Sequence, residues 1–88
     1  MRIYVKFYAK IKDEIGIDHM FLDIENDSTK LIEVIREIDR RMNKKIIEEY
    51  YVRRRLLISI NDTLIDIDDG ILLRNGDKID IMPLPSGG

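Results

Sequence analysis

The sequence predicts an α+β fold, in which a mixed β-sheet of four or five strands is crossed by one main α-helix. The chain has 88 residues, which suits one small domain with a single core. Near both ends of the chain, hydrophobic and polar residues alternate as they do in strands that bury one face. Between these regions, one segment repeats its hydrophobic residues at helical spacing. A helix with such a stripe has to bury it, and a sheet is the partner at hand.

The chain opens with two predicted strands joined as a β-hairpin. Met1–Ala9 alternates, and one of its faces consists of Ile3, Val5 and Phe7. Lys10–Gly16 is more polar and ends in glycine, so we expect a turn there. His19–Ile24 alternates again and is predicted to pair with the first strand.

The main helix is predicted over Ser28–Asn43. Four residues that commonly cap helices, Asn26 to Thr29, stand at its start. Behind them, hydrophobic residues recur every three or four positions, and the charged residues between them can face water. This stripe consists of Leu31, Val34, Ile35, Ile38 and Met42.

The segment after this helix, Lys44–Arg55, is ambiguous. Its residues fit a longer helix, a short second helix or the beginning of a strand. Leu56–Ile60 is predicted to be a strand that ends at the turn pair Asn61-Asp62, and residues 64–67 give a short extended piece.

Two further turns lead to the last strand. They are Asp68–Gly70 and Arg74–Asp77, the second with Asn-Gly at its centre, and the strand is Lys78–Met82. Proline lacks the backbone donor of a sheet ladder, so the chain from Pro83 onward is expected to leave the sheet. Residues 1–82 are therefore predicted to form the domain, and residues 83–88 an extended, flexible tail.

The predicted element order is β-β-α-β-(β)-β, with no repeat and no linker. The first and last strands must share one core with the helix. A mixed sheet crossed by one helix achieves this most economically, and that arrangement is the β-grasp architecture.

Composition excludes several kinds of chemistry. The chain has no cysteine, which removes disulfides, thiol catalysis and cysteine-ligated metals. Its single histidine, His19, is a poor basis for a zinc site, and no metal is expected. The sequence has no nucleophile-elbow serine and no phosphate-binding glycine loop. No apolar run approaches the roughly 20 residues that span a bilayer, so we expect a soluble, cytoplasmic protein.

Two charged clusters are interpreted as solvated surface. Asp66, Asp68 and Asp69 lie close together in the sequence and are expected to form an exposed turn rather than a metal site. Arg53-Arg54-Arg55, with lysines nearby, is the one basic concentration and could touch RNA or a phosphate. Acidic neighbours dilute it and the net charge of the chain is −2, so no nucleic-acid partner is expected.

The C-terminal pair Gly87-Gly88 is the strongest functional signal. Glycines have no Cβ and can enter a narrow channel, and the prolines before them reduce the freedom of the tail. The carboxylate of Gly88 is an anion at neutral pH, with a pKa of about 3.5, and is a poor electrophile. It needs activation to react, most simply as an acyl-adenylate made with ATP by another protein.

Four stretches of the chain stand in the order and spacing of one known family. They are Phe7–Gly16, Ile60–Leu64, Asn75–Ile79 and the closing Met82–Gly88. The first contains an aromatic pair, an alanine, a basic-acidic pair and a glycine, and the last is a proline-rich Gly-Gly tail. Through these stretches the whole chain resembles the MoaD family of small sulfur-carrier subunits of molybdopterin synthase, which are ubiquitin-like β-grasp proteins.

The resemblance implies a carrier cycle. A MoeB-like enzyme of the E1 type would adenylate Gly88 with ATP, and a sulfur donor would convert it to a thiocarboxylate. The tail would then enter a large MoaE-like subunit and deliver sulfur to cyclic pyranopterin monophosphate. The catalytic positions of the carrier itself would be Gly88 and Gly87, with no tightly bound cofactor.

The resemblance also implies which residues meet partners. It assigns partner binding to Tyr8, Leu64 and Met82 on the open sheet face, and to Pro83, Leu84, Pro85 and Ser86 in the tail. The alternation agrees for Tyr8, which falls opposite the predicted core face. If these residues are exposed together, they form an apolar patch of the kind that marks a binding site. The other interpretation is that Leu64 and Met82 belong to the core.

The chain departs from the family pattern at three places. Lys12 stands where arginine is usual, Leu84 interrupts a common proline pair, and Lys44–Arg55 is longer than typical. Two other functions stay open: a ubiquitin-like protein modifier or tRNA-thiolation carrier, and a binding module without C-terminal chemistry. Thiamin sulfur carriers are similar too, but usually shorter.

Overall fold

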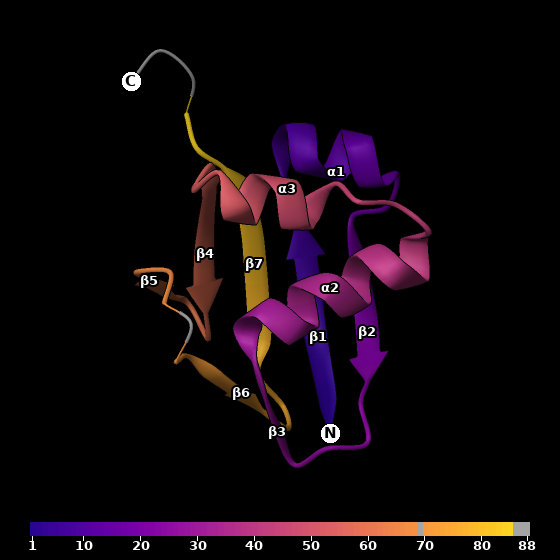
Figure 1. Cartoon of the computed structure of the whole chain (residues 1–88), viewed down its shortest axis with the longest axis vertical. Coiled ribbons are helices and arrows are strands. Elements are labelled where there is room, and N and C mark those ends of the chain that lie inside the picture. The colour runs from indigo at the N-terminus through magenta and orange to yellow at the C-terminus, as the bar shows by residue number, and fades with distance from the viewer. Residues whose placement is uncertain (69, 86–88) are drawn as a thin grey trace.

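The first and last strands of the chain lie side by side in the centre of one mixed sheet (Figure 1). The computed structural model describes residues 1–68 and 70–85. The sheet has the order β2-β1-β7-β4-β5, in which β1 and β7 are parallel and the other neighbours antiparallel. These strands are β1 (Arg2–Phe7), β2 (His19–Asp23), β4 (Leu56–Ile60), β5 (Thr63–Ile65) and β7 (Lys78–Pro83).

The segment between β1 and β2 is a helix, so the turn expected over Lys10–Gly16 is wrong. Helix α1 covers Ala9–Ile15, and its two buried side chains, Ile11 and Ile15, stand four residues apart. Gly16 ends the helix at a φ of 91°, which glycine adopts without strain, and its N–H donates to the carbonyl of Lys12 at 2.8 Å. The glycine therefore marks a helix end rather than a turn.

The main helix, α2, covers Leu31–Met42 and begins three residues later than predicted. Ser28–Lys30 is instead a short strand, β3, which pairs with β6 (Leu72–Arg74) in a second small sheet. The predicted side-chain cap is also wrong, because Lys30 occupies the cap position without a side-chain hydrogen bond. The N–H of Leu31 donates to the carbonyl of Ile71 at 3.0 Å, so this first amide is satisfied by the chain beside β6.

The ambiguous segment contains a separate short helix, α3 (Ile47–Val52). Its N-terminus is capped by a residue of the neighbouring helix. The buried carboxylate of Asp39 on α2 accepts hydrogen bonds from the N–H groups of Ile47 and Glu48, at 3.0 and 2.9 Å. Ile47 and Tyr51, one turn apart, face the core.

The turns predicted at Asn61-Asp62 and around Asn75-Gly76 are confirmed. Asn61 and Asp62 both have positive φ, 51° and 69°, as a tight hairpin between β4 and β5 requires. Asn75 and Gly76 form the turn before β7. In the turn expected over Asp68–Gly70, an Asp68 carboxylate oxygen accepts the N–H of Gly70 at 2.6 Å, and Asp69 lies outside the described residues.

Strand β7 runs one residue further than predicted, because Pro83 pairs with Leu56 of β4. The N–H of the next residue, Leu84, donates toward β4, to the carbonyl of Arg55 at 2.9 Å. Since amide directions alternate along a strand, the nitrogen of Pro83 faces the opposite side. The pairing of β1 there has already ended at Ile81, so proline costs no ladder bond.

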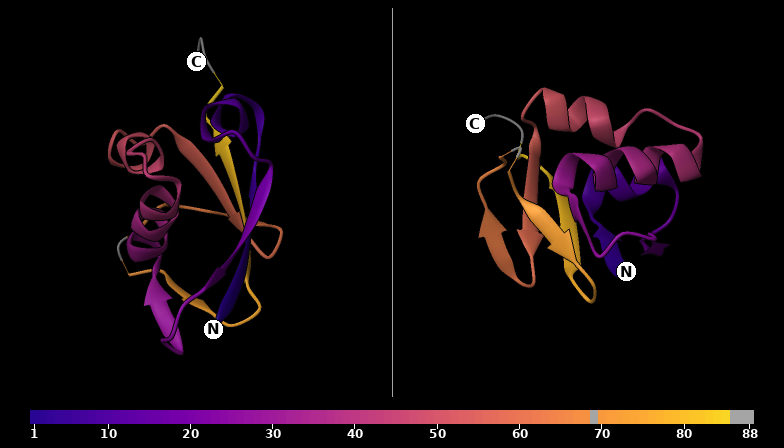
Figure 2. Two further views of the ribbon diagram at one scale, coloured as in Figure 1. Left: turned by 90° about the vertical axis from the view of Figure 1, so that its right-hand side faces the viewer. Right: turned by 60° about the horizontal axis from the view of Figure 1, so that its bottom comes forward.

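Helices α2 and α3 lie against one face of the sheet (Figure 2). The inner faces of the strands and the helical stripes form one core, including Ile3, Val5, Ile58, Ile79 and Ile81 at 0% exposure. The predicted stripe of the main helix is buried except for Met42, which packs at its margin. No helix within residues 1–68 and 70–85 is long and apolar enough to cross a membrane.

Candidate functional site: the outer sheet face and the root of the tail

Tyr8 lies on the outer face of the sheet, as the alternation predicts. The inward residues of β1 are buried, and Tyr8 follows the last of them, Phe7. Its N–H donates to the carbonyl of Ile81 at 3.1 Å, which holds it beside β7. The side chain is half-buried, so part of the ring is available to a partner.

The hydroxyl of Tyr8 donates to a carboxylate oxygen of Asp80 at 2.9 Å. Asp80 is the outward residue at the middle of β7 and is only 7% exposed. Desolvation raises the pKa of Tyr8 above its usual 10.0, and the hydrogen bond to the Asp80 carboxylate raises this pKa further. The phenol therefore stays protonated at neutral pH and keeps the tyrosine ring in place.

Tyr8 and Met82 stand beside each other in one row across the sheet. Phe7 pairs with Ile81 in the parallel ladder, so the following residues, Tyr8 and Met82, are neighbours. On the other side of Met82, its partner in β4 is Leu57, which is also half-buried. Leu57 was missed at the sequence level, although it alternates with the buried Leu56 and Ile58.

Leu64 is on the same outer face but in another row. It pairs with Ser59, which in turn pairs with Asp80, so it lies two strands away from β7. Its exposed fraction is 61%, and the interpretation of Leu64 as a core residue is therefore wrong. Met82 is half-buried and outside the central cluster of buried residues. The structure thus brings Tyr8 and Met82 together and leaves Leu64 at the rim of the face.

The root of the tail is anchored at the end of the sheet near α1 and α3 (Figure 1). The hydrogen bond from Leu84 to the carbonyl of Arg55 ties the tail to the residues that follow α3. Leu84 is 41% exposed and Pro85 is also exposed. The other predicted tail positions, Ser86, Gly87 and Gly88, lie outside the described residues.

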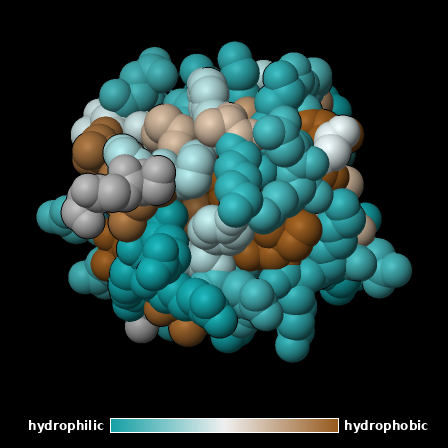
Figure 3. Space-filling view, turned by 90° about the horizontal axis from the view of Figure 1, so that it is seen from above, coloured by the Kyte–Doolittle hydropathy of each residue, from teal (hydrophilic) through white to brown (hydrophobic). Residues whose placement is uncertain are grey.

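A groove of about 1040 Å³ lies at this root, between α1, α3 and Pro83–Pro85. Figure 3 views the molecule from this end, where hydrophilic side chains predominate and smaller hydrophobic areas lie between them. Within residues 1–68 and 70–85, no group of three or more histidine, aspartate and glutamate side chains is placed to hold a metal ion. Among the described residues, the candidate site therefore consists of the outer sheet face and the tail root.

Known proteins resemble this chain over almost its full length. A model of the ThiS family matches residues 5–88. The molybdopterin synthase sulfur carrier subunit of Dictyostelium discoideum is 30% identical over 84 residues, which cover 96% of this chain and 93% of that protein.

Solved structures share the fold. SAMP1 from Haloferax volcanii covers 100% of both chains with a TM-score of 0.75 and 13% identity. Subunits 1 and 2 of the molybdopterin-converting factor from Helicobacter pylori were solved as a complex, and the match there has a TM-score of 0.59 at 24% identity, again over 100% of both chains. These neighbours confirm the predicted ubiquitin-like β-grasp fold.

The sequence matches confirm the resemblance to small sulfur-carrier proteins. The match to the family model ends at residue 88, so it includes both the β-grasp domain and the C-terminal tail. Because the family model matches residues 5–88 and a carrier subunit is 30% identical over 84 residues, the chain belongs to the ThiS family.

Proposed function

We propose that this protein carries sulfur for molybdopterin synthesis as a thiocarboxylate on Gly88. The observation that supports this most strongly is the near full-length match to the carrier subunit of Dictyostelium discoideum in a chain that ends in Gly87-Gly88. The described structure agrees with such a role, since a central strand, β7, leads directly into the tail.

The proposed chemistry takes place entirely at the C-terminal carboxylate. An activating enzyme of the E1 type joins this carboxylate to the α-phosphate of ATP, and pyrophosphate leaves. A donor that delivers sulfur as hydrosulfide (HS⁻) then attacks the acyl-adenylate, AMP leaves with one of the original carboxylate oxygens, and a thiocarboxylate is formed without any change of oxidation state. ATP belongs to the activating enzyme in this scheme, so the carrier itself needs no bound cofactor.

A MoaE-like large subunit is the proposed receiver of the charged tail. A relative from Helicobacter pylori was solved as a complex of subunits 1 and 2, which supports such a pairing. We assign the docking contacts to Tyr8 and Met82 on the outer face, with Leu64 at its rim. Pro83 to Ser86 lead the two glycines into the partner, where the thiocarboxylate gives its sulfur to cyclic pyranopterin monophosphate.

A ubiquitin-like modifier is the second candidate function. SAMP1, which is a small archaeal modifier protein, aligns over the whole chain with a TM-score of 0.75. A modifier uses the same adenylation but ends in an amide bond to a lysine of a target protein, and a tRNA-thiolation carrier delivers its sulfur to a base.

The proposal is tested by deleting Gly87-Gly88 in cells that depend on this chain for molybdopterin. We expect the deletion to abolish molybdopterin synthesis, while restoring the full-length chain recovers it. Retained synthesis by the shortened chain would end the carrier proposal. Covalent conjugates that survive denaturing purification, with molybdopterin unaffected by the deletion, would support the modifier instead.

A further inference from the structure

The groove at the tail root is positively charged in a protein whose net charge is −2. Its charged lining has four cationic side chains against two anionic ones. The cations are Lys10, Arg53, Arg54 and Arg55, and the anions are Glu14 and Glu49. The basic run noted in the sequence is thus brought beside the tail by the fold, about 30 residues away along the chain.

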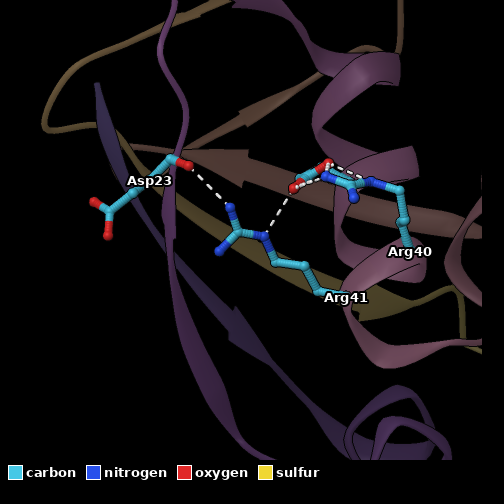
Figure 4. Close-up of polar contacts among 4 residues, drawn as sticks. Asp23, Arg40 and Arg41 are labelled. Atoms are coloured by element: carbon cyan, nitrogen blue, oxygen red, sulfur yellow. Dashed lines mark hydrogen bonds and ion pairs between the residues drawn. The ribbon is translucent and has the colours of Figure 1, made fainter.

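The arginines of this groove differ from those of α2 in their pairing. Arg36 pairs with Glu33 at 3.0 Å and with Glu48 at 3.2 Å. Arg41 pairs with Glu37 at 2.8 Å and also donates to the carbonyl of Asp23 at 2.9 Å (Figure 4). Arg40 shares Glu37 with Arg41, so each arginine of α2 has a carboxylate partner within the domain.

No carboxylate in the described part of the chain lies within ion-pair distance of Arg53, Arg54 or Arg55. One candidate, Glu14, is already engaged, because it lies 4.0 Å from the ammonium of Lys10 and accepts a hydrogen bond from the hydroxyl of Tyr50 at 3.3 Å. Three adjacent arginines therefore line the groove without a carboxylate of the described residues in ion-pair contact, and the lining keeps more cations than anions. An external anionic surface can approach this excess of positive charge.

The backbone presents these side chains at some conformational cost. Arg54 has a φ of 57°, a left-handed conformation that favours glycine at the end of a helix. Its guanidinium lies 5.4 Å from the centre of the Tyr51 ring. The next residue, Arg55, accepts the hydrogen bond from Leu84, so the arginines and the tail are held together. A protein that takes the tail must also approach the arginines.

We propose that this groove receives an acidic surface of the large-subunit-type protein that takes the tail. This inference rests on the proposed function, and it further specifies that the partner surface facing the groove is negatively charged. A protein fits the site better than a nucleic acid, because the cations are confined to one groove that Pro83, Leu84 and Tyr50 also line. Opposite charges at such a rim speed the encounter and set the orientation in which the tail enters.

Charge reversal tests this with a matched control. The variant R53E/R55E reverses two groove charges and keeps the backbone carbonyl that holds Leu84. The control K30E/R74E changes the net charge equally, but on β3 and β6, at the other end of the molecule (Figure 1). Binding to the large-subunit-type protein from the same genome is measured by association kinetics at low and high salt.

We expect R53E/R55E to bind about tenfold more weakly than the unaltered chain at low salt, mainly through slower association. K30E/R74E should stay within about twofold, and the gap should narrow at high salt, where charges are screened. A third variant, R54G, should unfold at the same temperature as the unaltered chain or higher, since glycine suits the left-handed position, and yet bind more weakly.

The outcomes separate this inference from the proposed function. If the unaltered chain neither binds the large subunit nor gains sulfur, the proposed function itself fails. If the unaltered chain binds the large subunit and gains sulfur, but R53E/R55E and K30E/R74E bind equally well, the partner has no acidic surface at this groove and the inference is wrong. The inference is also overturned if R53E/R55E loses binding to transfer RNA while its affinity for the large subunit is unchanged.

Discussion

Asp80 shows how a single residue organises the outer sheet face. It is a carboxylate in the middle of a central strand, only 7% exposed, where an unpaired charge is costly. The hydroxyl of Tyr8 donates to it, and Lys78 two residues earlier on β7 has its pKa raised chiefly by the Asp80 charge. This pairing holds Tyr8 at the place where a partner would meet the sheet, next to Met82 and the tail.

Replacing Tyr8 with phenylalanine should destabilise the domain by about 1–3 kcal/mol, because it removes a donor from a buried carboxylate. The raised pKa of Tyr8 also predicts a pH effect. The folded state holds the phenolic proton more tightly, so the stability that Tyr8 contributes is complete below pH 10.0 and is lost as the pH rises beyond it. Urea unfolding between neutral and alkaline pH measures both effects.

The matched control is Tyr4→Phe, in β1 and on the same outer face of the sheet. Its hydroxyl has no hydrogen-bond partner among the described residues, so the substitution should change the free energy of unfolding by less than about 0.5 kcal/mol. Equal effects of the two substitutions, or an alkaline profile that Tyr8→Phe leaves unchanged, would show that the contact with Asp80 contributes nothing to stability.

At the scale of elements, the sequence predicted what hydrophobic periodicity alone can encode. The alternation located β1, β2 and β4, and the stripe located α2. Helix α1 was missed because seven residues contain only one pair of buried side chains, Ile11 and Ile15, among charged ones. Strand β3 was missed because Ser28–Lys30 becomes a strand through its pairing with β6, more than 40 residues away.

Helix α3 could not be decided locally, because its N-terminal cap comes from α2. Removing that cap with Asp39→Ala should cost about 2–4 kcal/mol, since two N–H groups at the start of α3 lose their acceptor in a largely buried place. The loss should be centred on α3, with reduced protection of its amides from hydrogen exchange.

Hydrogen exchange and denaturant unfolding of Asp39→Ala check this, with Asp39→Asn as the comparison. Asparagine keeps one acceptor oxygen at the same position and should recover part of the stability. An Asp39→Ala protein that unfolds at the same denaturant concentration as the unaltered chain would contradict the assigned role of Asp39.

At the scale of the whole molecule, the parallel pairing of β1 with β7 sends the tail out from the centre of the sheet. A partner that takes the tail therefore has Tyr8 on one side of it and the residues after α3 on the other. The outer row was partly predictable, since alternation places Tyr8 outward. The arginine groove could not be predicted, because no local sequence pattern indicates that Arg53–Arg55 lie beside Pro83–Pro85. Such neighbours are made only by the tertiary fold.

The most direct test of the carrier function is the intact mass of the protein after incubation with ATP, an activating enzyme of the E1 type and a sulfur donor. If Gly88 carries sulfur, the mass rises by the amount that matches replacement of one oxygen by sulfur. The gain should be absent without ATP, after deletion of Gly88, and when the C-terminal carboxyl group is amidated. An unchanged mass with several activating enzymes that charge other carriers would show that this protein does not carry sulfur on Gly88.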